Sequence, residues 1–257
     1  MPAALLAPSE LAAPWRAAGL ARAARCIAAT SATAAVTALR SSRLRHQGGR
    51  TRDRARVLRD AARAVLRHHG LSVEASGAVP AGPCLLACNH VSWVDPVVVV
   101  AQVPCVPIAK ADVRGWPVIG SIVGGLGVIF PARGEAGSGL RVLREAEAAL
   151  AAGVPVLNVP EGTTTDGRGV LQFRKGLFGL AERLGVPVIP VALRYEPPEL
   201  CWIGAAAFVP HYLKLAASRG ASVRIRFGAP VLASAAGGAT ALAHEVRERV
   251  VHLLEAA

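Results

Sequence analysis

Residues 84–100 read CLLACNHVSWVDPVVVV, and this stretch decides the fold. A short apolar run, Cys84–Ala87, comes first, and a second apolar run begins at Pro96. We expect a strand, a tight loop and a helix in turn, because Asp95 suits an N-cap and Pro96 suits the first helical turn. His90 then lies in the loop, with the Asp95 side chain folded back towards it.

The pairing of His90 with Asp95 suggests proton-transfer chemistry. A carboxylate can hold one ring nitrogen of an imidazole and fix its tautomer, which leaves the other nitrogen to take a proton from a hydroxyl. A purely structural hydrogen bond is the alternative for such a pair taken alone. The catalytic interpretation therefore depends on what stands further along the chain.

Three more blocks follow that pair in a fixed order. They read GVIFPAR at 127–133, VPEGTT at 159–164 and VPVIPV at 186–191. Together with the HX4D motif at 90–95, they resemble the glycerolipid acyltransferase family, the lysophosphatidic acid acyltransferases. The resemblance covers about residues 70–230, and the combination of blocks is far more specific than any single one.

The resemblance implies transfer of a fatty acyl group from a thioester, on coenzyme A or acyl carrier protein, to a lysolipid hydroxyl. The implied acceptor is 1-acylglycerol-3-phosphate, which gives phosphatidic acid in phospholipid synthesis. His90 would be the general base and Asp95 its orienting partner. The implied acceptor-site residues are Arg133, Glu161, Gly162 and Thr163, with Lys110 as a weaker candidate. Backbone amides near Gly162 and Thr163 are candidate oxyanion donors, and no cofactor and no metal is expected.

The third block departs from the family at two positions. The family commonly has an aromatic residue before Pro-Glu-Gly-Thr and an arginine after it, where this chain has Val159 and Thr164. A Glu-Gly-Thr-Thr form resembles relatives that acylate other lysolipids, so lyso-ornithine lipid is the alternative acceptor. Arg174 and Lys175 are further cations that either serve the acceptor or simply begin the next helix.

Positive charge is concentrated near the N-terminus. The formal net charge is +12, and residues 1–70 hold 13 arginines against three acidic residues. Arginines recur every three or four residues from Arg52 to Arg67, beside an apolar face, which predicts a basic amphipathic helix closed by Gly70. Either an anionic membrane surface or nucleic acid fits such a segment, and the family resemblance favours the membrane and no nucleic acid.

We therefore divide the chain into a basic helical, membrane-associating segment, 1–69, and an α/β acyltransferase domain, 70–257. The expected location is the cytoplasmic face of the cell membrane, as a peripheral or monotopic protein. A non-enzymatic basic membrane-binding module remains the alternative of another class.

Strand and helix patterns alternate after residue 70, which predicts an α/β fold with a mixed, largely parallel sheet flanked by helices. A helix that ends on glycine is followed twice by a proline-containing apolar strand, at 152–156 and at 184–188. The expected strands and helices are listed here: strands 71–76, 84–88, 106–109, 127–130 and 222–227; helices 10–40, 52–67, 96–103, 139–152 and 240–254; a broken helix at 112–123; and a polar break at 41–49.

Two other nucleophiles compete with direct attack by the acceptor. The five cysteines show no zinc spacing and suggest a reduced, cytosolic-facing protein with buried thiols. Cys88 near His90 is a conceivable nucleophile, although a small buried residue at a strand end is the plainer interpretation. Ser92 with His90 and Asp95 would make a hydrolase, but the chain lacks a Gly-x-Ser-x-Gly elbow.

Overall fold

The computed structural model describes residues 17–116, 119–131, 137–196, 200–203, 207–233 and 237–256. Its elements, in chain order, are α2 Ala17–His46, α3 Thr51–His68, β1 Leu71–Ser76, β2 Leu85–Cys88, α4 Asp95–Gln102, β3 Val106–Pro107, α5 Ala111–Arg114, α6 Ile119–Gly125, α7 Ser138–Ala151, β4 Val156–Asn158, α8 Gly176–Leu184, β5 Val188–Glu196, α9 Phe208–Ala217, β6 Ala221–Phe227 and α10 Ala239–Glu255.

The six strands form one sheet in the order β1-β6-β5-β2-β4-β3. Neighbouring strands are parallel except for β5 and β6, which pair antiparallel over Val191–Glu196 and Ser222–Phe227. The prediction of a mixed, largely parallel sheet is therefore confirmed. Strands near the centre are buried on both faces, as in β2, where all four residues are inaccessible, which is typical of parallel strands covered by helices.

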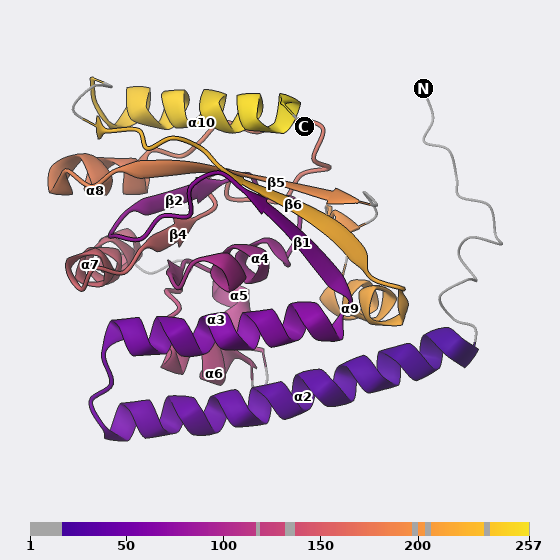
Figure 1. The fold of residues 1–257 in the computed structure, drawn as a ribbon. Helices are drawn as coiled ribbons and strands as arrows, with labels where there is room; N and C mark the ends of the chain where they lie inside the picture. The colour runs from indigo at the N-terminus through magenta and orange to yellow at the C-terminus, as the bar shows by residue number, and fades with distance from the viewer. Residues whose placement is uncertain are drawn as a thin grey trace.

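Helices cover both faces of the sheet (Figure 1). On one face α7, α8 and α10 pack against the strands through a core that includes Phe178 and Leu242. On the other face α3, α4 and α9 enclose a second core that includes Val98, Leu66 and Leu215. The HX4D motif at 90–95 is positioned by these elements, because β2 ends at Cys88 and α4 begins at Asp95.

The order of the strands places a topological switch point, where a ligand can bind, at the carboxyl end of β2. From β2 the chain moves through α4 to β3 on one side, and from β4 it crosses through α8 to β5 on the other side. Ligands of open α/β sheets bind at such a switch point, outside the carboxyl ends of the strands. Because β2, β3, β4 and β5 run parallel, the loops that follow β2 and β4 meet at this edge.

The N-terminal helices form an antiparallel pair below the sheet (Figure 1). α3 contributes Ala55, Ala62 and Leu66 to the cores of the sheet. α2 is 30 residues long, roughly 45 Å, and lies outside α3, where it also contacts α6 and α9. Within the residues the structure describes, no helix has both the length and the apolarity needed to cross a bilayer.

Arginines of these two helices bond to the carboxyl ends of three other helices. Such helix ends carry unsatisfied carbonyls and partial negative charge, which favour cationic donors. The donor–acceptor pairs are Arg63 Nε to Ala101 O at 2.7 Å, Arg52 Nε to Ala152 O at 2.9 Å and Arg22 Nε to Ala217 O at 3.0 Å. Part of the predicted basic face thus stabilises the fold.

Two expectations for the elements need correction, and one helix was not expected. The polar break predicted from residue 41 is wrong up to His46, because Ser41 is buried and α2 continues against α6. The strand predicted at 127–130 is a single bridge, between Ile129 and Ile108. The helix α9 was not expected, because its sequence is apolar on nearly every side and reads as plain core.

Candidate active site

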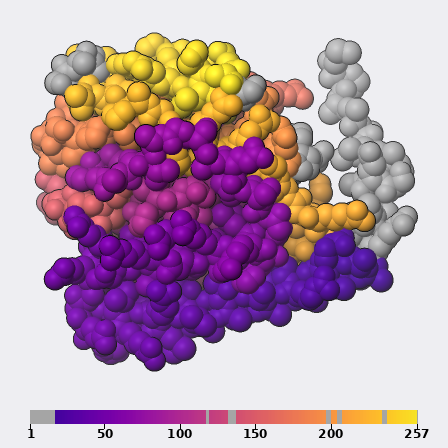
Figure 2. All heavy atoms as spheres, viewed as in Figure 1, coloured from indigo at the N-terminus to yellow at the C-terminus, as the bar shows by residue number. Residues whose placement is uncertain are grey.

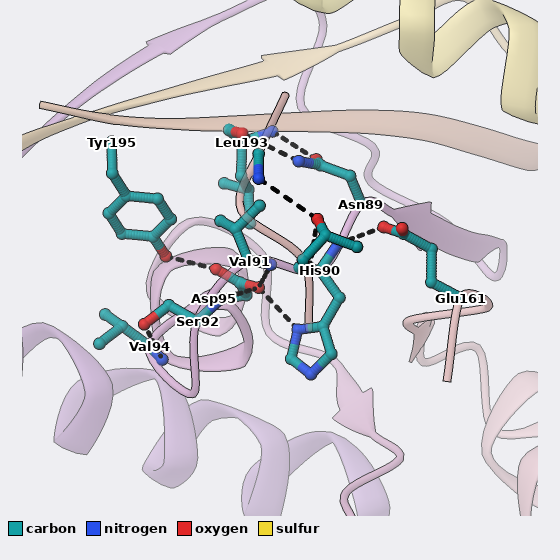
Figure 3. A network of polar contacts seen from close by, with 11 residues as sticks. Asn89, His90, Val91, Ser92, Val94, Asp95, Glu161, Leu193 and Tyr195 are labelled. Atoms are coloured by element: carbon teal, nitrogen blue, oxygen red, sulfur yellow. Dashed lines mark hydrogen bonds and ion pairs between the residues drawn. The ribbon is translucent and has the colours of Figure 1, made fainter. Parts of the chain in front are cut away.

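His90 and Asp95 point towards each other at the carboxyl end of β2 (Figure 3). The distance from His90 Nδ1 to Asp95 Oδ2 is 2.7 Å. The Asp95 side chain is fully buried, whereas the His90 side chain keeps 18% of its surface exposed. The other ring nitrogen, Nε2, bonds to none of the described residues. The imidazole therefore has one nitrogen fixed by a carboxylate and one left for a substrate.

Four donors hold the Asp95 carboxylate in place. Besides His90 Nδ1, the backbone amides of Val91 and Ser92 donate to Oδ2 at 2.8 and 3.0 Å. The expected N-cap role of Asp95 is wrong by one position, because the helix α4 has Val94 at its N-cap and includes Asp95 as a helical residue. The carboxylate instead folds back on the loop before it, where it fixes both the backbone and the imidazole.

The fourth donor is Tyr195, which the sequence analysis did not identify. Its hydroxyl donates to Asp95 Oδ1 at 2.6 Å. Burial, followed by the neighbouring Asp95 charge, raises the pKa of Tyr195 well above its ordinary value, so the phenol stays a protonated donor. A buried tyrosine near the end of an apolar strand needs a hydrogen-bond partner, and that requirement was the available signal.

Asn89 joins the loop between β2 and α4 to β5. Its side-chain amide donates to Leu193 O at 3.0 Å and its carbonyl accepts from Leu193 N at 2.8 Å. The asparagine thereby satisfies both backbone groups of Leu193 beyond the last β2–β5 backbone pair (Figure 3). The residue before His90 is fixed as firmly as the residues after it.

The loop 161–165 is attached to His90 at both of its ends. Glu161 Oε1 accepts from His90 N at 2.6 Å, and Glu161 Oε2 accepts from Leu171 N at 2.8 Å. At the other end, Thr165 N donates to His90 O at 2.8 Å. The sequence-predicted residues Glu161, Gly162 and Thr163 are therefore held on a loop bonded to the backbone of His90.

Both carboxylate oxygens of Glu161 accept the hydrogen bonds that attach the loop. The side chain is only 4% exposed, and burial raises the pKa of Glu161 although backbone donors from Leu171 and His90 oppose the shift. Of the two amides expected to stabilise an oxyanion, Gly162 N donates to Val159 O at 3.1 Å within the turn. Thr163 N has no acceptor in the described part of the chain, so it is the freer donor.

The two predicted cations differ in what the structure says of them. Lys110 follows β3 at the same edge of the sheet, and its Nζ lies 3.2 Å from Asp112 Oδ2 with 59% of the lysine side chain exposed. Arg133 lies outside the described residues. Lys110 is thus placed near the edge, with a local acidic neighbour.

Neither competing nucleophile is available to a substrate. Cys88 is fully buried, and that burial, with the charge of Asp95 as a smaller cause, raises the pKa of its thiol well above the usual value. Ser92 is also fully buried, and its hydroxyl accepts from Val94 N at 3.4 Å, with no bond to His90. The geometry favours attack by an external hydroxyl over a covalent acyl-enzyme.

An aromatic cluster packs beside the loop between β2 and α4. Trp93 of the motif packs edge-on against Phe208 of α9, with ring centroids 5.2 Å apart. Phe208 in turn lies 4.0 Å from the Trp116 ring and 5.8 Å from the Tyr212 ring. This surface is apolar and close to His90, and both properties suit an acyl chain.

Comparison with known proteins agrees with these features. A family model described as Acyltransferase matches residues 66–194. The chain is 34% identical over 214 residues to the lyso-ornithine lipid O-acyltransferase of Brucella abortus (strain 2308), which covers 76% of this chain and 80% of that protein. It is also 34% identical over 150 residues to the 1-acyl-sn-glycerol-3-phosphate acyltransferase of Neisseria meningitidis serogroup B, covering 58% of this chain and 59% of that protein.

A solved structure shares the fold. The crystal structure of the 1-acyl-sn-glycerophosphate acyltransferase PlsC from Thermotoga maritima aligns with a TM-score of 0.70, over 93% of this chain and 95% of that chain. The sequence identity of this pair is 21%, so the likeness concerns the arrangement of helices and strands.

Proposed function

Because this chain belongs to the acyltransferase family and is an acyltransferase, we propose that it transfers a fatty acyl group from a thioester to the hydroxyl of a lysolipid. The observation that carries the proposal is the 2.7 Å contact between His90 Nδ1 and Asp95 Oδ2, which leaves Nε2 for the acceptor. The proposed donor is acyl-coenzyme A or acyl-acyl carrier protein.

The proposed reaction needs only groups at this edge of the sheet. His90 Nε2 takes the proton of the lysolipid hydroxyl while its oxygen attacks the thioester carbonyl carbon. Thr163 N–H donates to the oxyanion that forms. The carbon–sulfur bond then breaks, the imidazolium returns its proton to the leaving sulfur, and an ester and a free thiol result.

The acceptor is proposed to be a lysolipid whose head group carries a phosphate or a carboxylate. 1-Acylglycerol-3-phosphate is the first candidate. Lyso-ornithine lipid is the second, and two observations favour it: the neutral Thr164 after Glu-Gly-Thr, and the relative of that name whose match spans most of both chains. Arg133 and Lys110 are proposed to serve the head group in either case.

We also propose that α2 holds the enzyme on an anionic membrane surface at the cytoplasmic face. Large apolar side chains are exposed along its length, namely Leu20, Ile27, Val36 and Leu39. Between residues 20 and 39 the exposed surface carries a single charge, Arg25, and basic residues close the helix at its end. Exposed apolar side chains followed by basic residues suit a helix lying in the interface of an anionic leaflet, and α2 borders the lower side of the molecule in Figure 2.

Thiol release measured with a panel of lysolipids tests the proposed reaction. The purified chain is mixed with acyl-coenzyme A or acyl-acyl carrier protein and each acceptor in turn, and His90→Ala is the control. We expect release that requires a lysolipid and falls about 10²- to 10⁴-fold in the variant. Release without any acceptor would indicate a hydrolase, and an unchanged rate for His90→Ala would remove the imidazole from the chemistry.

A further inference from the structure

The guanidinium of Arg174 lies across the turn that follows Glu161. Gly162 has a φ of +72°, and a Cβ placed on it would lie 2.6 Å from Arg174 Cζ and 2.9 Å from Nε. The absence of a side chain at position 162 therefore makes room for the arginine. Arg174 N also donates to Pro160 O at 3.0 Å, which fixes the backbone from which the side chain reaches.

This position lies on the loop that is bonded to the backbone of His90. Gly162 belongs to the loop 161–165, whose two ends are bonded to the backbone N–H and C=O of His90. A group that rests on Gly162 is held by that loop close to His90. Arg174 comes ten residues after Thr164 in the sequence, yet the fold brings it back to the same turn.

The guanidinium has the charge and the freedom to bind an anion. Arg174 is exposed, and no carboxylate of the described residues pairs with it, whereas Arg168 and Arg183 are paired with Asp166 and Glu147. The nearest acidic residue in the turn, Glu161, has each oxygen engaged by a backbone amide. The planar fork of an arginine can donate two parallel bonds to a phosphate or a carboxylate.

The turn offers no other cation, because residues 162–165 are one glycine and three threonines. We propose that Arg174 binds the phosphate or carboxylate of the acceptor lysolipid's head group and so selects acceptors that carry such a group. The proposal rests on the proposed function and adds a specificity-determining residue to the site. Arg174, which lies just before α8, thereby supplies the positive charge for the head group that the neutral Thr164 cannot supply.

Substitutions at positions 174 and 175 test the assignment. Lys175 is the matched control, since it is the adjacent exposed cation. Steady-state kinetics are measured for Arg174→Gln, Arg174→Lys and Lys175→Gln with 1-acylglycerol-3-phosphate, lyso-ornithine lipid and acyl-coenzyme A. For Arg174→Gln we expect the acceptor KM to rise about ten- to hundredfold, with the thioester KM unchanged. Arg174→Lys should lie between Arg174→Gln and the wild type, and Lys175→Gln should match the wild type.

The lipid acceptor that responds identifies the head group. A rise in KM with 1-acylglycerol-3-phosphate assigns Arg174 to a phosphate, and a rise with lyso-ornithine lipid assigns it to a carboxylate. An unchanged acceptor KM, a rise in the thioester KM instead, or an equal effect of Lys175→Gln would overturn the assignment. A wild-type enzyme that acylates no lysolipid would instead refute the proposed function, so the two failures are distinguishable.

Discussion

Replacing Asp95 by asparagine separates the charge of this residue from its structural role. Oδ2 accepts from His90 Nδ1, Val91 N and Ser92 N, and Oδ1 accepts from the Tyr195 hydroxyl. An asparagine that places its oxygen at the Oδ2 position keeps all three N–H donors. Its amide group then faces the Tyr195 oxygen, which can rotate its proton away and accept.

The expected size of the effect follows from these contacts. The loop should stay folded, and the free energy of unfolding should fall by only about 1–3 kcal/mol, because bonds to a charge become bonds to a neutral group. The imidazolium formed during proton transfer loses its buried counter-charge. General-base catalysis contributes about 10²- to 10⁴-fold, and since the orientation of His90 is retained we expect kcat to fall by about 10²-fold, or roughly 2.7 kcal/mol of barrier.

Asp95→Ala provides the contrast. It leaves the amides of Val91 and Ser92 and the imidazole N–H without an acceptor in a buried place, at about 1–3 kcal/mol each. Thiol release gives kcat and urea denaturation gives stability for both variants. We expect Asp95→Asn to lose rate with little stability, and Asp95→Ala to lose both. A kcat for Asp95→Asn within about threefold of the wild type would refute the catalytic role of the carboxylate.

Three further substitutions test the groups around the dyad. Tyr195→Phe removes the donor to Asp95 Oδ1 and should lower stability by about 1–3 kcal/mol, with a smaller loss of kcat than Asp95→Asn; unchanged stability in urea would argue against that bond. Asn89→Ala should cost about 1–3 kcal/mol for each of the two orphaned backbone groups of Leu193, which hydrogen exchange at Leu193 N would report. Burial raises the pKa of Glu161, so the folded protein keeps the carboxyl proton of Glu161 to a higher pH than the unfolded chain does. The free energy of unfolding of the wild type, compared with that of Glu161→Gln, should therefore fall as the pH rises through the raised pKa. Urea titrations across acidic pH that show the opposite slope would contradict this expectation.

Local signals explain why much of the fold was predictable. A glycine follows the end of both α7 and α8, and the proline-containing apolar stretch after it leads into a strand of the sheet, β4 in the first case and β5 in the second. The HX4D spacing similarly predicts the contact of His90 with Asp95. The two residues are only five positions apart, so the short loop and the start of the helix bring their side chains together. These features depend on neighbours in sequence, where spacing and turn chemistry suffice.

Contacts between distant residues could not be predicted in the same way. Tyr195 meets Asp95 across 100 residues, and Asn89 meets Leu193 across 104, and no local pattern encodes either pair. Arg174 and Lys175 were equivalent in the sequence, and only the packing of the arginine on Gly162 separates them. The site is therefore a local motif completed by partners that the sheet brings to it.

In the basic N-terminal segment, too, the helix was predictable from local sequence and its contacts with distant residues were not. These contacts determine how membrane binding should be tested. Deleting α2 would remove more than a membrane contact, because Ala23 and Cys26 pack against α9 and Arg22 bonds to the end of that helix. Weaker vesicle binding by such a truncation would not distinguish an absent anchor from a damaged fold.

Point substitutions at exposed positions of α2 avoid this difficulty. Leu20 and Leu39 are 52% and 64% exposed, so Leu20→Glu with Leu39→Glu should leave stability unchanged while placing charge on the proposed membrane face. Leu140 on α7 is 61% exposed and gives the matched control, Leu140→Glu. In sedimentation with vesicles that contain anionic lipid, we expect the double variant to bind at least about tenfold more weakly, since it loses apolar contact and adds repulsion. Equal binding by the double variant and the wild type, or an equal loss in Leu140→Glu, would exclude α2 as the membrane face.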